Sequence, residues 1–220
     1  MKPPELGASL LSAHPFEIKN IAHELVESEI DFFHIDIMDG NFVPNIALNS
    51  SVCKALAADY PHIPLDVHFM TTSQGLSAIM PSFLEARPRW ITFHVEMEKD
   101  LKPFFDLCIS FDVAPGLAVN PDTSLDKLKP FLPYCEIVLL MSVPPGYGGQ
   151  AFQQKTFERL EILNQWRKDA SKSFKIEVDG GINLPIAKKL IEKGADMVVI
   201  GSQLVAQKNK KDFIFNFHQF

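Results

Sequence analysis

The sequence has few cysteines, no long apolar run and no excess of basic residues, which argues against a disulfide-rich protein, a membrane-spanning protein and a nucleic-acid-binding protein. It carries only three cysteines and no C-x-x-C pair, so we expect reduced, inert thiols and a cytoplasmic location rather than a disulfide framework. It has no apolar run of the roughly 18 or more residues that a membrane span needs. Acidic residues (27) outnumber lysines and arginines (21), for a net charge of −6. We therefore expect no nucleic-acid partner and no membrane partner, because either would require a basic surface.

Linkers and low-complexity segments are also absent, so we expect one domain over residues 1–220. Short apolar runs recur at intervals of about 27 residues, as buried strands alternating with helices would. The runs lie at 5–10, 32–37, 64–70, 90–95, 113–119, 136–142, 174–179 and 196–201. Most are separated by segments with helical spacing, among them 155–168 and 211–219. The pattern predicts an α/β fold, a single (β/α)8 TIM barrel. The alternative is an open doubly wound sheet, whose edge strands should look more polar.

Polar side chains stand at the ends of several predicted strands. The two-residue period of a strand puts His34 and Asp36 on one face and Ile35 and Ile37 on the other. The same spacing recurs in the pairs Asp66 and His68, His94 and Glu96, and Glu177 and Asp179. In a (β/α)8 barrel the carboxyl ends of all strands meet at one mouth. These charges would therefore converge in a small volume, where burial requires pairing or a metal ion.

Four of these residues make a plausible ligand set: His34, Asp36, His68 and Asp179. Two imidazoles and two carboxylates suit Zn²⁺, Fe²⁺, Mn²⁺ or Co²⁺, and the donor types do not choose among them. Asp66, His94, Glu96 and Glu177 could orient the ligands from behind. The alternative for this second group is a buried ion network without a metal-related role.

Glycine-containing loops follow three adjacent predicted strands. They are PPGYGGQAF at 144–152, DGG at 179–181 and GS at 201–202. Backbone N–H groups in such loops bind phosphate without a lysine, and phosphate sites recur after strands 7 and 8 of this fold. The loops therefore predict a phosphate site. Met38, Met70 and Met141 should also project near the mouth, either as a water-poor wall or as ordinary packing.

A metal, two carboxylates and a phosphate site at one mouth suggest proton chemistry on a small sugar phosphate. The metal would stabilise the enediolate left when the proton next to a ketone is removed. Asp36 and Asp179 come from separated strands and could stand on opposite faces of the substrate. One would take the proton and the other return it on the far side, which inverts that carbon.

The chain resembles the ribulose-phosphate 3-epimerase family along nearly its whole length. The motifs that carry the resemblance are SLLSA (9–13), HIDIMDGNFVPN (34–45), LDVHFM (65–70), FHVE (93–96), GLAVNPDT (116–123), LLMSVPPGYGGQAF (139–152), IEVDGGIN (176–183) and GADMVVIGS (194–202). The resemblance implies a (β/α)8 barrel and the interconversion of D-ribulose 5-phosphate with D-xylulose 5-phosphate, a step of the pentose phosphate pathway. It also implies a homo-oligomer.

The resemblance assigns roles to residues of this chain. It implies one divalent metal ion on His34, Asp36, His68 and Asp179, with Asp36 and Asp179 as the acid–base pair. The implied substrate contacts are Ser9, His68, Gly146, Tyr147, Gly148, Gly149, Asp179, Gly180, Gly181, Gly201 and Ser202. Met38, Met70 and Met141 match the methionines that flank the enediolate.

Three segments depart from the family pattern. IALNS at 46–50 stands where the family reads close to LTFGP, TTSQG at 71–75 lacks a usual proline, and ARPR at 86–89 replaces AGAD. The first two lie near the expected mouth, so a six-carbon ketose phosphate such as allulose 6-phosphate is the alternative substrate.

Other functions fit the residues less well. A Schiff-base aldolase would need a lysine at the mouth, and Lys175 is expected near the bottom. An orotidine-phosphate-type decarboxylase would need a lysine between strand-end aspartates, where this chain has Ile37 and Met38. A non-catalytic sugar-phosphate sensor would have no need for both aspartates.

Overall fold

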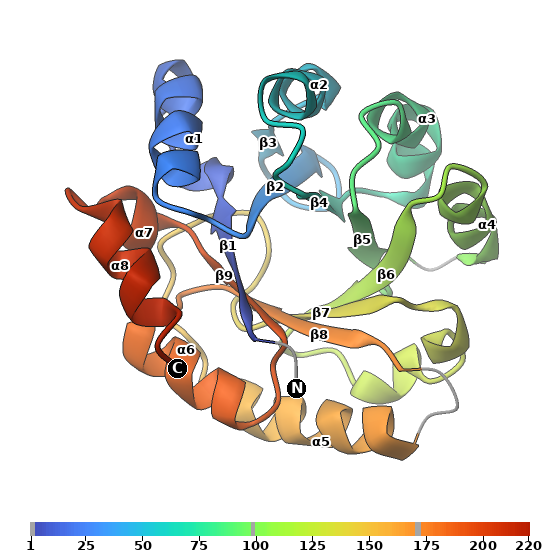
Figure 1. Ribbon diagram of the computed structural model, residues 1–220. Coiled ribbons are helices and arrows are strands. Elements are labelled where there is room, and N and C mark those ends of the chain that lie inside the picture. The colour runs from blue at the N-terminus through green and yellow to red at the C-terminus, as the bar shows by residue number, and fades with distance from the viewer. Residues whose placement is uncertain (1–2, 98–99, 170–172) are drawn as a thin grey trace.

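The computed structural model describes residues 3–97, 100–169 and 173–220, which form a closed barrel of strands surrounded by helices (Figure 1). The eight parallel strands are β1 (Glu5–Ser9), β2 (Phe32–Asp39), β4 (Leu65–Met70), β5 (Trp90–His94), β6 (Ala114–Val119), β7 (Ile137–Met141), β8 (Lys175–Asp179) and β9 (Met197–Ile200). Each strand pairs with the next, and β1 pairs with both β9 and β2. That double pairing closes the ring, so the predicted barrel is confirmed and an open sheet is excluded.

Helices cover the outside of the ring. They are α1 (Ile18–Glu27), α2 (Ser50–Asp59), α3 (Ser73–Leu84), α4 (Lys102–Ser110), α5 (Lys155–Asp169), α6 (Leu184–Glu192), α7 (Ser202–Val205) and α8 (Lys210–Phe217). Four short 3₁₀ helices join them: η1 (Leu10–Ser12), η2 (Pro15–Glu17), η3 (Leu125–Leu128) and η4 (Leu132–Tyr134). In the described parts of the chain, no helix combines the length and the apolar character needed to cross a bilayer.

Two features of the connections differ from the expectation of eight equal strand–helix units. The segment between β6 and β7 contains only η3 and η4, because Pro130 and Pro133 lack the N–H that an α-helix would use and their rings crowd the preceding turn. A short strand, β3 (Ile46–Ala47), pairs antiparallel with the end of β2. Its two residues are too few to produce a detectable alternation in the sequence.

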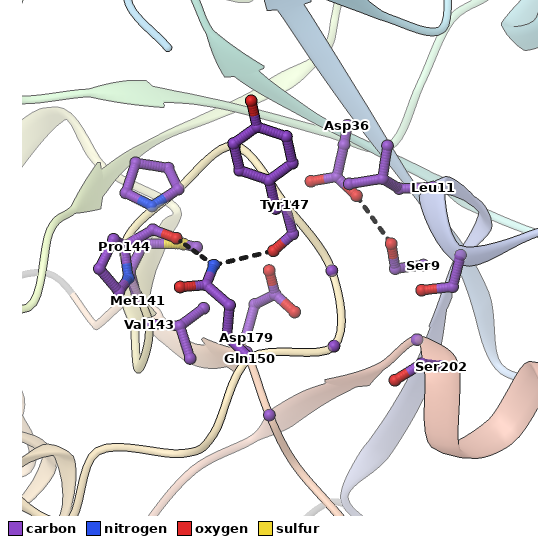
Figure 2. A pocket seen from close by; sticks show the side chains of 18 of the residues that line it. Ser9, Leu11, Asp36, Met141, Val143, Pro144, Tyr147, Gln150, Asp179 and Ser202 are labelled. Atoms are coloured by element: carbon purple, nitrogen blue, oxygen red, sulfur yellow. Dashed lines mark hydrogen bonds between the residues drawn. The ribbon is translucent and has the colours of Figure 1, made fainter. Parts of the chain in front are cut away.

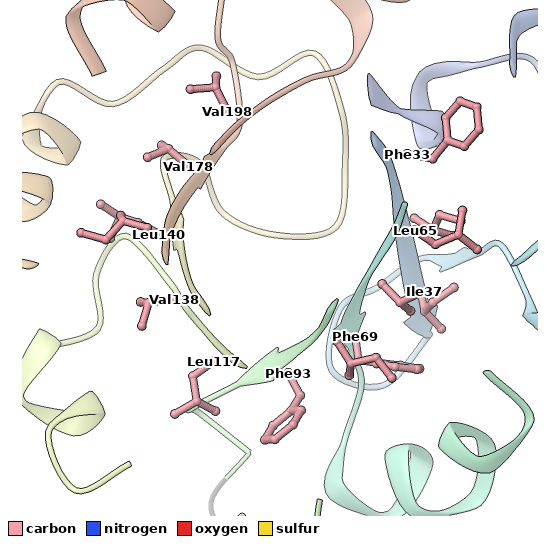
Figure 3. Packing of buried hydrophobic residues seen from close by; sticks show 14 of the residues in the cluster. Phe33, Ile37, Leu65, Phe69, Phe93, Leu117, Val138, Leu140, Val178 and Val198 are labelled. Carbon is pink, nitrogen blue, oxygen red and sulfur yellow. The ribbon is translucent and has the colours of Figure 1, made fainter. Parts of the chain in front are cut away.

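The core lies mainly between the strands and the helices. Apolar side chains radiate outward from the ring of strands, as Figure 3 shows for Phe33, Ile37, Phe69 and Phe93. The side chains of β2 alternate as predicted. Ile35 points outward and packs in this outer core, whereas His34 and Asp36 point inward and belong to the buried polar interior. Burying one face of each strand in this way fixes the register of the other face.

The register brings the polar strand ends together. Asp36 pairs across β2 and β4 with His68, and His34 with Asp66. Ser9 of β1 lies beside His34, and Asp179 of β8 lies beside Met141 of β7. Strand pairing alone therefore gathers residues from five segments of the sequence at one end of the barrel.

Candidate active site

A cavity of about 110 Å³ opens at the carboxyl ends of the strands (Figure 2). It is several times larger than the ~10–15 Å³ that one water requires, so it can take a small molecule. Among the predicted site residues, those that line it are Ser9, Asp36, Met38, Met70, Met141, Gly146, Tyr147, Gly148, Gly149, Asp179, Gly180, Gly181, Gly201 and Ser202. His34 and His68 do not line it; both are fully buried and approach Asp36 from below.

The predicted ligand set forms a compact cluster. One donor atom from each of His34, Asp36, His68 and Asp179 lies within 4.8 Å of the others. Both His34 Nε2 and His68 Nδ1 are 3.3 Å from Asp36 Oδ1. His34 Nε2 is fully buried, and its close polar contact is the ion pair with Asp36 Oδ1. Two histidine nitrogens and two carboxylates gathered in this way are donors that a divalent metal ion takes, and a bound ion would replace the contacts that they make with one another.

Two further carboxylates lie behind His34, deeper in the barrel. Asp66 Oδ2 is 2.5 Å from His34 Nδ1, and Glu177 Oε1 is 3.7 Å from the same nitrogen. A carboxylate in this position holds the proton on Nδ1 and leaves Nε2 free to face the cluster. Burial and the charge of Asp66 raise the pKa of Glu177 to about 8. The structure thus places Asp66 and Glu177 behind a proposed ligand, as expected.

The two mouth aspartates differ in proton affinity. Burial raises the pKa of each, but for Asp36 the charges and hydrogen bonds of His34 and His68 outweigh burial and hold the pKa well below its usual range. Asp36 also accepts a 2.7 Å hydrogen bond from Ser9 Oγ. For Asp179, burial and the nearby Asp36 carboxylate outweigh His34 and raise the pKa to about 7. Chemically identical groups held at different proton affinities are typical of acid–base pairs.

The loop after β7 closes over one side of the cavity and is held by specific hydrogen bonds. Gln150 Nε2 donates to the carbonyl oxygens of Pro144 (2.7 Å) and Tyr147 (2.9 Å), as Figure 2 shows. Asn45 Nδ2 donates to Gly146 O at 2.8 Å. The loop is therefore tied both to itself and to the segment after β2.

The comparisons with known proteins agree with this geometry. A family model described as the ribulose-phosphate 3 epimerase family matches residues 5–205. The chain belongs to this family. A ribulose-phosphate 3-epimerase of Aquifex aeolicus (strain VF5) is 34% identical over 204 residues, 93% of this chain and 90% of the relative. One of Helicobacter pylori (strain ATCC 700392 / 26695) is 34% identical over 208 residues, 94% and 93% of the two chains.

Solved structures extend the likeness of fold beyond the epimerase family. The crystal structure of KGPDC from Streptococcus mutans superposes with a TM-score of 0.75 and covers 99% of this chain and 97% of that one. Its sequence is only 13% identical, so the likeness concerns the barrel and not the chemistry.

Sequence reasoning missed three polar residues of this epimerase-family site, Ser12, Gln150 and Gln203, which also line the cavity. The first two lie inside the motifs SLLSA and PPGYGGQAF, and Gln203 directly follows GADMVVIGS. Strand periodicity could not find Ser12 because η1 turns the chain back toward the mouth after β1. Its Oγ would lie 2.6 Å from a Cβ added to Gly201, so the two loops pack closely here.

The segments that depart from the family pattern lie outside the described lining of the cavity. In 46–50, Asn49 begins α2 by accepting from the Ser51 N–H at 3.0 Å. In 71–75, Thr72 donates its N–H to Asp39 Oδ2 at 2.8 Å. In 86–89, the Arg89 N–H donates to the Leu65 carbonyl at the opposite end of the barrel.

Proposed function

We propose that this member of the epimerase family interconverts D-ribulose 5-phosphate and D-xylulose 5-phosphate by removing and returning the proton at C3. The observation that carries the proposal is the placement of Asp36 and Asp179. Their carboxylates belong to β2 and β8, with β1 and β9 between them in the ring, and both face one cavity. Groups on separated strands can address opposite faces of a bound substrate, as inversion of one carbon requires.

We propose that His34, Asp36, His68 and Asp179 hold one divalent metal ion, Zn, Fe, Mn or Co. When bound, the ion supplies positive charge that stabilises the oxygen of the enediolate as the proton leaves. The compact placement of the four donors, with His34 Nε2 and His68 Nδ1 each 3.3 Å from Asp36 Oδ1, is the feature of this chain that most directly supports the assignment.

The side chains around the pair would prepare it for proton transfer. In the absence of metal, Asp36 has the lower proton affinity and Asp179, whose pKa is raised to about 7, has the higher, a difference that suits one carboxylate to accept a proton and the other to give one. Ser9 fixes the orientation of Asp36 through its hydrogen bond. Met38 and Met70, 4% and 1% exposed, cover the reacting centre with apolar surface and keep bulk water away from the enediolate.

The phosphate would be bound by neutral groups. No lysine or arginine appears among the described residues that line the cavity. Backbone N–H groups of the loops at Gly146–Gly149, Gly180–Gly181 and Gly201, with the hydroxyls of Ser12 and Ser202, are the available donors. Gly181, at φ +63°, allows the approach of two of these loops, because a Cβ there would lie 2.5 Å from the Phe152 nitrogen.

Isotope exchange tests the reaction directly. Purified protein supplied with each of the four metals in turn should incorporate solvent deuterium at C3 of ribulose 5-phosphate and form xylulose 5-phosphate. Absence of exchange with all four would contradict the proposal.

A rate comparison with allulose 6-phosphate checks the substrate: a higher kcat/KM for the hexulose phosphate would replace the five-carbon assignment with the six-carbon one. The homo-oligomeric state and cytoplasmic location stay predictions, and light scattering of the purified protein tests the first.

A further inference from the structure

A second histidine stands behind the proposed ligand His68, away from the cavity. His68 Nε2 lies 2.9 Å from His94 Nε2, and His94 Nδ1 lies 3.0 Å from Glu96 Oε2. Both imidazoles are fully buried, and the ring of Phe42 covers His94 at a centroid distance of 4.7 Å. The three side chains His68, His94 and Glu96 therefore form a buried line that starts at the metal cluster and that the mechanism above does not use.

Glu96 is fixed at the far end of this line. Its Oε1 accepts the backbone N–H of Asn120 at 2.8 Å. The Asn120 carbonyl in turn accepts from Arg159 Nη2 at 3.0 Å, and Arg159 Nη1 donates to Thr123 O at 2.8 Å. The guanidinium on α5 thus holds the peptide that holds Glu96. Although burial opposes it, the hydrogen bond and charge of His94 lower the pKa of Glu96 to about 2.

The hydrogen positions along the line follow from these contacts. An ionised carboxylate only accepts hydrogen bonds, so the proton between Glu96 and His94 sits on His94 Nδ1. A neutral His94 then presents an unprotonated Nε2, and two facing ring nitrogens can share only one proton. When His68 binds metal through Nδ1, its remaining proton lies on Nε2 and is donated to His94 Nε2. Nδ1, which without metal can donate to the ionised Asp36, then has the lone pair that a metal ion requires.

We propose that His94 and Glu96 are positioning residues that set the tautomer of His68 and so keep its Nδ1 available as a metal ligand. The proposal rests on the metal site proposed above and adds to it two residues that touch neither the metal nor the substrate. Outer partners of this kind typically contribute about 10–100-fold to metal affinity.

The substitution Glu96→Gln tests the direction of the hydrogen bonds along this line of side chains, because a carboxamide has one accepting oxygen and one donating NH₂. The Asn120 N–H requires the oxygen, so the NH₂ must face His94 Nδ1. His94 then becomes the donor at Nε2, and the proton of His68 moves to Nδ1, where it blocks the metal. Glu96→Ala removes the partner without imposing the wrong tautomer. The expected order of metal affinity is therefore wild type, then Glu96→Ala, then Glu96→Gln.

Two measurements examine this order. Competition of Zn²⁺ between the protein and a chelating dye should show about a 10–100-fold loss for Glu96→Gln and a smaller loss for Glu96→Ala. Long-range ¹H–¹⁵N NMR of the Zn²⁺-loaded wild type should show His68 protonated at Nε2 and His94 at Nδ1, whereas metal-free Glu96→Gln should show His68 protonated at Nδ1 and His94 at Nε2. Circular dichroism and thermal unfolding establish that the variants are folded.

The outcomes distinguish a failure of the proposed role of His94 and Glu96 from a failure of the proposed metal site. Zn²⁺ affinity of Glu96→Gln within threefold of wild type, a greater loss in Glu96→Ala than in Glu96→Gln, or His94 protonated at Nε2 in the Zn²⁺-loaded wild type would each overturn the proposal. Failure of the wild-type protein to bind any of the four metals would instead overturn the proposed metal site. The tautomers of metal-free Glu96→Gln would still be measurable in that case, so the two failures are distinguishable.

Discussion

Both ends of the barrel contain charged side chains, but the two ends pair them differently. At the amino-terminal end, Lys175 Nζ lies 2.8 Å from Glu5 Oε1, and Trp90 lies between two cations, with Lys175 and Arg89 at 4.7 and 4.8 Å from its ring centre. Phe32, Trp90, Ile137, Met197 and Val199 fill the space beside them. The charges at this end are matched by partners of opposite charge or by aromatic faces.

At the carboxyl end the same strands place like charges together. Asp36 and Asp179 face a common cavity, and the buried Asp66 Oδ1 has no hydrogen-bond partner among the described residues. Strand β8 shows the contrast within five residues, with the paired Lys175 at one end and Asp179 at the other. Satisfied polar groups stabilise the fold, whereas incompletely satisfied ones store free energy that a ligand can release. This difference identifies the functional end without reference to any relative.

The largest expected effect comes from neutralising the carboxylate at the functional end. We expect Asp179→Asn to lower kcat by about 10²–10⁴-fold, because an amide cannot take or give the transferred proton. The metal-free variant should be at least as stable as the wild type, since a partly buried carboxylate near Asp36 and Asp66 is lost. An epimerase assay and thermal unfolding in chelator measure both quantities. Near-normal turnover would remove Asp179 from the acid–base pair.

A second, intermediate effect is the pH dependence of the metal-free protein. The folded-state pKa of Asp179 is raised to about 7 and that of Glu177 to about 8, well above the unfolded values of about 4. The folded protein therefore holds protons that unfolding releases, and this stabilisation is lost as pH rises through 7 and 8. A histidine with a lowered folded pKa such as His68 opposes this fall near pH 6.5, where the unfolded imidazole is partly protonated, and is neutral in both states above about pH 7.5. Although burial opposes it, Asp36 and Asp66 raise the folded pKa of His34, which adds to the fall.

Thermal unfolding in the presence of chelator, from pH 6.5 to 8.5, checks this expectation. The midpoint should fall with rising pH, and it should fall less steeply in Asp179→Asn. A midpoint that rises over this interval would show that the carboxylates of the functional end are already ionised in the folded protein. Added Zn²⁺ should reduce the dependence, because bound metal stabilises the ionised form.

The sequence predicted the strands and their inward residues better than the loops that shape the cavity. Eight strands and the inward placement of His34, Asp36, His68 and Asp179 follow from two-residue periodicity, which burial of the opposite face enforces. The family assignment followed from motifs and is confirmed by the family model. The roles of the site residues remain predictions that the experiments above address.

Local pattern could not predict the loop contacts that shape the cavity. Asn45 and Gly146 are 101 residues apart in the chain, and their hydrogen bond depends on how two loops meet after the barrel has closed. The return of Ser12 toward the mouth depends on a single 3₁₀ turn. The line from His68 to Glu96 was visible only as a spacing, because the sequence does not show which ring nitrogens face each other.

The smallest expected effect comes from the matched substitution at the other end of β8. Lys175→Met removes the ion pair with Glu5 and a cation above Trp90 while keeping a flexible apolar side chain in contact with the ring. Because the pair is partly solvated, we expect a loss of only about 1 kcal/mol in the free energy of unfolding, measured by urea denaturation. kcat/KM should stay within twofold of wild type, since Lys175 lies at the opposite end of the strand from Asp179. A tenfold fall in kcat/KM would show that the two ends are coupled through β8. It would contradict the assignment of stability to the amino-terminal end and of function to the carboxyl end.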